Sequence, residues 1–144
     1  MSMLPIYLHL SATAFMAGLI WFVQVVHYPL FAHVGAAAFV DYEAIHTRLT
    51  SFVVGPAMAI EGVTALLIAG WYRDDVGLGL VLAGLALLAV IHASTVTLQV
   101  PSHRRLSEAY DRAEVAHLVR TNWIRTAGWS ARTGVALAML VVAT

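Results

Sequence analysis

The chain has 144 residues, of which 60% are hydrophobic and only 11% are charged, and its mean hydropathy is +0.81. Soluble domains carry roughly 25% charged residues, so this composition is typical of a protein embedded in lipid. The absence of cysteine excludes disulfides and thiolate chemistry, and the net charge of zero provides no field that would recruit nucleic acid. We therefore expect the lipid bilayer, and no nucleic acid, as the partner of this surface.

Four apolar stretches are long enough to cross a membrane as helices. A spanning helix needs about 20 apolar residues, because each residue rises about 1.5 Å across a hydrocarbon core near 30 Å. The stretches that meet this requirement are residues 5–29, 49–72, 78–100 and 123–143. The sequence predicts a single all-α domain over residues 1–144, a bundle of four transmembrane helices.

Two of the connections have helical patterns of their own. Residues 36–48 contain helix formers and no breaker, so this segment can run into the second span. In residues 102–121 the apolar side chains of Leu106, Tyr110 and Leu118 recur on one side, as in a helix that lies on a membrane surface. We expect short interfacial helices in these connections.

The placement of arginine predicts the orientation of the chain. Six Arg residues lie in or beside the first and third connections, whereas the second connection holds only Arg73. Cytoplasmic loops are enriched in Lys and Arg. The interfacial helices are therefore predicted on the cytoplasmic side and both termini outside, in an integral protein of the bacterial inner (plasma) membrane.

Polar side chains within the apolar stretches carry the functional signal, because lipid tolerates them only when they are paired or hydrated. Most of them fall in the cytoplasmic half, where we expect them to turn inward and form a pocket. The expected catalytic residues are His27, His92, Asn122 and Arg125, and the expected substrate-binding residues are Gln24, Tyr28, Gln99, Trp123 and Trp129.

The fourth span carries a polar stripe. Asn122, Arg125, Trp129 and Arg132 follow one another in steps of three, four and three residues, which keeps them on one helix face. Arg132 lies deep in the predicted hydrocarbon region, at about the level of Glu61 in the second span. We expect these two residues to form a structural ion pair.

Several imidazoles are candidate metal ligands. His27, His46, His92 and His103 could ligate a transition metal ion or haem. Glu43 and His46 form one ExxH pair, whereas di-iron carboxylate bundles use two such pairs and two further Glu residues. No HExxH or CxxCH motif occurs, so the identity of a cofactor stays open.

The second half of the chain, LQVPSHRRLSEAYDRAEVAHLVRTNWIRTAGWSARTG, resembles the small four-helix membrane proteins grouped as DUF1772, the anthrone-oxygenase-like family. The residues at comparable places are Pro101, His103, Leu106, Asn122, Trp123 and Arg125, with His103 standing where the family has Asn. The segment HLSATAFMAGLIWF is more loosely similar to the HemJ-type protoporphyrinogen oxidases, whose first-span His matches His9. Those proteins also need a Lys, which this chain lacks. Both resemblances imply a bundle that hosts oxidation of aromatic or tetrapyrrole substrates.

Two classes of function follow from these observations. The first is a membrane-embedded oxidoreductase or oxygenase that takes a lipophilic aromatic or quinone-like small molecule from the bilayer. There His27 or His92 would act as general base, and Arg125 with Asn122 and Gln99 would stabilise a phenolate or enolate oxygen. The alternative is a non-enzymatic unit for proton, ion or small-molecule permeation, or an accessory subunit of a larger complex. Small residues in the first and third spans leave a homo-oligomer open.

Overall fold

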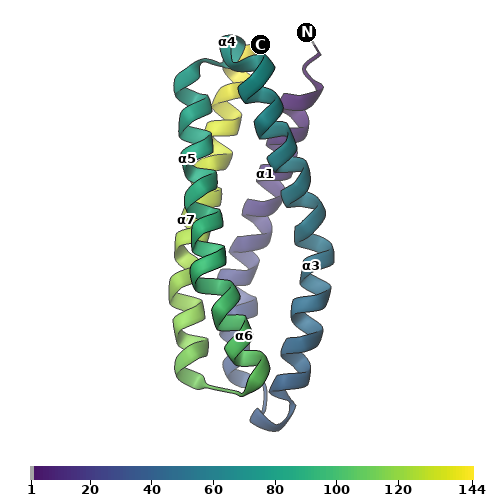
Figure 1. Cartoon of the computed structure of the whole chain (residues 1–144), viewed down its shortest axis with the longest axis vertical. Helices are drawn as coiled ribbons and strands as arrows, with labels where there is room; N and C mark the ends of the chain where they lie inside the picture. Colours follow the sequence, from purple (N-terminus) through teal and green to yellow (C-terminus); the bar gives the residue numbers. More distant parts are fainter. Residues whose placement is uncertain (1) are drawn as a thin grey trace.

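The structure is a computed structural model that describes residues 2–144, and this part of the chain contains helices and no strand. Its elements join end to end into four long helices that run up and down beside one another (Figure 1). Both termini lie at the same end of the bundle, next to the short helix α4. The opposite end holds the first and third connections.

Each long helix is assembled from consecutive elements. The first comprises α1 (Leu4–Phe22), the π-helical turn η1 (Val23–His27), α2 (Tyr28–Leu30) and the 3-10 turn η2 (Phe31–His33). The second comprises α3 (Ala36–Leu67), the π-helical turn η3 (Ile68–Tyr72) and α4 (Arg73–Val76). The third comprises α5 (Leu78–Ser94), the π-helical turn η4 (Thr95–Gln99) and α6 (Val100–Glu108), and the fourth is α7 (Arg112–Ala143).

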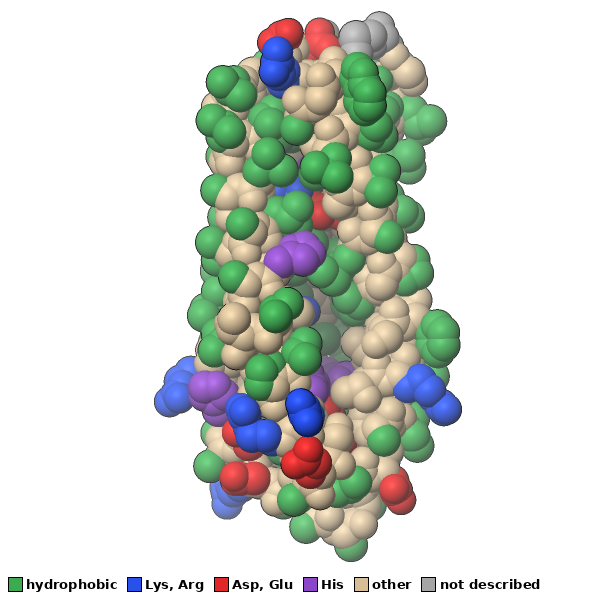
Figure 2. All heavy atoms as spheres, viewed as in Figure 1, with side chains coloured by type: hydrophobic (Ala, Val, Ile, Leu, Met, Phe, Trp, Pro, Cys, Tyr) green, Lys and Arg blue, Asp and Glu red, His purple; other side chains and the backbone are tan. Residues whose placement is uncertain are grey.

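The four long helices, Leu4–His33, Ala36–Val76, Leu78–Glu108 and Arg112–Ala143, are each long and apolar enough to cross a membrane. Their outer surface is rich in exposed large apolar side chains, such as Phe52, Leu66 and Val96. Figure 2 shows that charged side chains gather at the two ends of this face, most of them at the end that holds the first and third connections. This distribution matches the apolar belt that a bilayer requires.

Both connections are helical, as expected, and their helices continue the long helices of the bundle. Residues 36–48 form the beginning of α3, and residues 102–121 are divided between α6 and α7 by a turn at Ala109–Asp111. The carboxylate of Asp111 caps α7 by accepting a 2.8 Å hydrogen bond from the backbone N–H of Ala113. Leu106 and Leu118 are fully buried, so both segments pack against the bundle.

Two apolar clusters fill the interior. The larger one occupies the middle and the connection end, and it consists of Met16, Ile20, Val23, Tyr28, Phe31, Phe39, Ile91, Leu106, Val115, Leu118 and Trp129. The smaller one lies at the end with the termini and consists of Ile6, Ile68, Val76, Val81 and Met139.

A buried ion pair ties three helices together near the smaller cluster. Arg132 of α7 contacts the carboxylate of Glu61 of α3 through two of its nitrogens and donates its third to the carbonyl of Gly84 in α5. Both charged side chains are almost completely buried. The pair therefore fixes the relative positions of α3, α5 and α7.

Candidate functional site

Two of the π-helical turns hold predicted site residues. Gln24 and His27 belong to η1 in the first long helix, and Gln99 closes η4 in the third. A π-helical turn adds a residue to a helical turn, which re-aims the side chains around it, and such turns are frequent at functional sites. Both turns lie in the half of the bundle that also holds the first and third connections.

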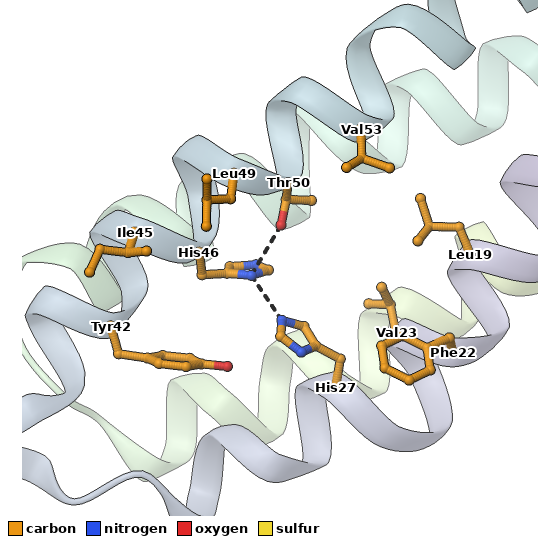
Figure 3. Close-up of a pocket in the computed structure, with 10 residues that line it drawn as sticks. All are labelled: Leu19, Phe22, Val23, His27, Tyr42, Ile45, His46, Leu49, Thr50 and Val53. Atoms are coloured by element: carbon orange, nitrogen blue, oxygen red, sulfur yellow. Dashed lines mark hydrogen bonds between the residues drawn. The ribbon is translucent and has the colours of Figure 1, made fainter.

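Four side chains from three helices form a His/Glu cluster, which we define as His27, Glu43, His46 and His103. Nε2 of His27 lies 2.8 Å from Nδ1 of His46, and that same Nδ1 lies 3.1 Å from the hydroxyl of Thr50 (Figure 3). The carboxylate of Glu43 contacts Nδ1 of His103. Ligand atoms from Glu43, His46 and His103 all lie within 4.8 Å of one another, so the cluster joins α3 to the neighbouring helices.

Tyr28 extends this cluster toward the centre of the bundle. Its hydroxyl lies 2.9 Å from Nε2 of His103, the ring nitrogen opposite to the one that contacts Glu43. Tyr28 itself is buried in the larger apolar cluster. The imidazole of His103 is thus held from both sides.

A second network holds the guanidinium of Arg125. Nη1 of Arg125 donates to Oδ1 of Asn122 over 3.1 Å, and the Asn122 amide donates to Oε1 of Gln24 over 3.0 Å. Gln24 in turn donates to the carbonyl of Val119 over 3.0 Å. Each of these polar side chains is buried, and together they connect η1 to α7.

Two cavities flank His46. The first, of about 380 Å³, lies between α1, η1 and α3, and Figure 3 shows His27, His46 and Thr50 on its wall among apolar side chains. The second, of about 390 Å³, is bounded by α2, α3, η4, α6 and α7. Its polar lining consists of Tyr28, His46, Thr47, Thr50, Ser51, Thr95, Gln99, His103 and Arg125. Both volumes fall in the range of pockets that bind small molecules, which is about 300–1,000 Å³.

His92, Trp123 and Trp129 neither line these cavities nor support the residues that do. His92 of α5 is exposed, and its Nδ1 lies 2.9 Å from the carbonyl of Leu88. Trp123 is also exposed and meets Trp21 edge to face, with ring centroids 5.6 Å apart. Trp129 is fully buried in the larger apolar cluster. The structure therefore brings none of the three into the pocket expected for them.

The other predicted residues are brought together. Tyr28, Gln99 and Arg125 line the second cavity, while Gln24 and Asn122 support Arg125 from behind. Gln99 is itself fixed by hydrogen bonds of 3.0 Å from the hydroxyl of Ser94 and 3.2 Å to that of Thr121. The candidate metal ligands His27, His46 and His103 share the His/Glu cluster.

Glu43 is the site residue that sequence reasoning does not place in the pocket. Its ExxH spacing with His46 is a visible signal, but the apolar pattern assigns the segment to a connection rather than to a bundle helix. Because α3 begins at Ala36, Glu43 points into the interior, where its side chain is fully buried. Within residues 2–144, its Oε2 atom has no hydrogen-bond partner.

Fold and site together define a small all-α bundle with a partly buried His/Glu cluster, an Arg–Asn–Gln network and two cavities at one end. No family model matches the chain, no curated protein matches it, and no solved structure matches it.

Proposed function

We propose that the protein is a membrane-embedded oxygenase that acts on a lipophilic aromatic substrate bearing an acidic methylene or hydroxyl group. The substrate would enter from the bilayer into the cavities beside His46. Exposed apolar side chains of α3, including Leu49 and Val53, form part of the first cavity wall, and this favours lateral entry of an apolar molecule.

The guanidinium of Arg125 is the observation that carries this proposal. Arg125 lines the second cavity, yet it is only 8% exposed, and no carboxylate of residues 2–144 forms a salt bridge with it. Its Nε has no hydrogen-bond partner in the same part of the chain. A buried cation without a counter-charge favours an anionic ligand, and a phenolate or enolate oxygen suits a mostly apolar cavity.

The reaction that fits this site is oxidation of a methylene flanked by aromatic rings. Imidazoles of the His/Glu cluster line both cavities and would accept the methylene proton, while Arg125 would stabilise the enolate oxygen that results. Molecular oxygen is the oxidant. For an anthrone, one methylene group and one dioxygen molecule give one carbonyl group and one water molecule. Both C–H bonds break, one oxygen atom enters the carbonyl, and the four electrons that the methylene carbon loses are gained by dioxygen.

The test uses the purified full chain in lipid vesicles with anthrone as the probe. Formation of anthraquinone is followed by absorbance, and the rate without protein is subtracted. The wild type should accelerate the reaction, and Arg125→Gln should lower kcat/KM by about 100-fold, the usual effect of removing one oxyanion donor. Arg120→Gln is the matched control, because Arg120 lies on the same helix but is exposed.

Equal rates in Arg125→Gln and wild-type vesicles would overturn the assignment of this cavity. A wild-type rate of anthrone oxidation no higher than that of empty vesicles would overturn the oxygenase proposal itself.

A further inference from the structure

We infer that Glu43, His46 and His103 form a mononuclear site for a divalent transition metal, and that the metal is iron(II). This inference rests on the proposed function and deepens it, because it names the cofactor of the same site. Its first support is the donor set: two imidazoles and one carboxylate, with ligand atoms within 4.8 Å of one another.

The burial of Glu43 is an independent observation that points to a ligand. The side chain is fully buried, and Oε2 has no hydrogen-bond partner within residues 2–144. A buried carboxylate oxygen is costly unless it is paired, hydrogen-bonded or bound to a metal. Oε1 already faces His103, so a cation beside these two groups would compensate the charge and occupy the free lone pairs.

The neighbours of the two imidazoles are arranged as metal ligands require. A metal-bound His commonly uses its other ring nitrogen for a hydrogen bond that fixes the ring. Nδ1 of His46 is engaged by His27 and Thr50, which leaves its Nε2 as the candidate ligand atom. Nε2 of His103 is engaged by Tyr28, which leaves its Nδ1, the atom that faces Glu43.

The donor set selects a metal ion over haem. The ring nitrogens of His27 and His46 lie 2.8 Å apart and in direct contact, so no porphyrin plane fits between these imidazoles. Two His and one carboxylate with open coordination positions are the ligand set of non-haem iron(II) oxygenases. The second cavity, which His46 and His103 both line, provides room for the open positions.

Iron(II) would supply a binding position for dioxygen next to the cavity. With His46 and His103 as ligands, His27 is the remaining imidazole of the cluster. Its Nε2 lies 2.8 Å from Nδ1 of His46, so we assign His27 as a positioning residue that orients this ligand.

The experiment measures metal binding without any substrate. Purified full-length protein is stripped with a chelator and titrated with Co(II), whose visible absorption reports protein coordination. About one Co(II) per chain should bind to the wild type, and Glu43→Gln, His46→Gln and His103→Gln should each lose this band. Tyr28→Phe should weaken binding by about 10- to 100-fold, as loss of an outer hydrogen bond does at other metal sites.

The matched controls remove the same chemical groups elsewhere. His33→Gln and Glu108→Gln each change an exposed residue at the same end of the bundle, and both should bind Co(II) as the wild type does. Size-exclusion profiles and helix content establish that each variant folds. Elemental analysis of protein isolated from iron-replete cells should find iron.

A wild-type chain that shows no Co(II) band, or ligand variants that bind Co(II) normally, would overturn the site. Zinc in place of iron in the isolated protein would overturn the choice of metal. Binding of about one metal ion per chain without anthrone oxidation would overturn the proposed function but not the metal site. Oxidation that survives complete metal removal would leave the proposed function intact and would show that the metal is not its cofactor.

Discussion

Asn122 orients the guanidinium of Arg125: its Oδ1 accepts a 3.1 Å hydrogen bond from Nη1, while its amide group donates to Gln24. Both side chains are buried, so the direction of the positive charge toward the second cavity depends on this contact. We therefore assign Asn122 as a positioning residue that does not itself touch the substrate.

Replacing Asn122 should impair turnover more than substrate binding. We expect Asn122→Leu to lower kcat for anthrone by about 10-fold with little change in KM, because the loss concerns orientation of a transition-state contact. Steady-state kinetics in vesicles measure both constants. Ser130→Ala, which loses the contact of Ser130 with Trp21 on the outer side of the same helix, is the control. A rise in KM with unchanged kcat would contradict the positioning role.

Removing one partner of the buried ion pair between Glu61 and Arg132 should destabilise the fold more than replacing both partners with apolar residues. Removing one partner leaves the other charge unpaired, so Arg132→Met should destabilise the fold by about 3–5 kcal/mol and lower the yield of folded protein. The double variant Glu61→Leu with Arg132→Met should recover much of this loss. Thermal unfolding in detergent measures the three variants, and a double variant as unstable as the single one would argue against a mainly electrostatic cause.

The close approach of α5 and α7 at Gly128 gives a second stability prediction. A Cβ atom at this position would lie 2.7 Å from Cγ1 of Ile91, so Gly128→Ala forces a shift in the packing. Overpacking of this kind costs about 1–3 kcal/mol. Gly134→Ala is the matched control on the same helix, because a Cβ there meets nothing within 4 Å. Equal unfolding temperatures for both variants would show that α5 and α7 accommodate the added methyl group without loss of stability.

The orientation in the membrane is testable because the chain contains no cysteine. Single Cys substitutions at Ala109, in the third connection, and at Asp74, in the second, introduce unique exposed thiols. The excess of Arg near the first and third connections predicts that an impermeant maleimide labels Asp74→Cys in intact cells and spares Ala109→Cys. The reverse labelling pattern would invert the orientation.

An apolar layer separates the two polar groups of the bundle. Met16, Ile20, Ile91 and Trp129 are buried between the network around Arg125 and the ion pair of Arg132. A proton path across the membrane needs hydrogen-bonding groups or water along its length, so we expect vesicles that contain the protein to hold a proton gradient as long as empty ones. Faster loss of the gradient in wild-type vesicles, abolished by replacement of Glu61 or His27, would favour the permeation hypothesis instead.

The helices could be predicted because long apolar runs and helical spacing depend only on local sequence. The stripe of Asn122, Arg125, Trp129 and Arg132 is buried as its spacing predicts, since α7 is a regular helix over this range. The Glu61–Arg132 pair follows from the same reasoning, because two opposite charges at one depth in an apolar bundle are each costly to bury unless they pair.

What the sequence could not reveal depends on backbone irregularity and packing. Helical spacing places His92 and Gln99 on one face, but the π-helical turn η4 comes between them and rotates that face, so Gln99 is buried while His92 is exposed. Glu43 meets His103 because α3 extends through the first connection and packs beside α6, and Tyr28 of α2 meets the same imidazole from the first long helix. Distances of this kind between segments 60 and 75 residues apart are properties of the tertiary fold.

Oxygen uptake by wild-type vesicles supplied with anthrone tests the central claim most directly. An oxygen electrode and product absorbance are read together on the same sample. We predict one dioxygen molecule consumed for each anthraquinone formed, at a protein-dependent rate that falls by about 100-fold in Arg125→Gln. Product formation without matching oxygen consumption, or uptake that is the same with and without the protein, would contradict an oxygenase at this site.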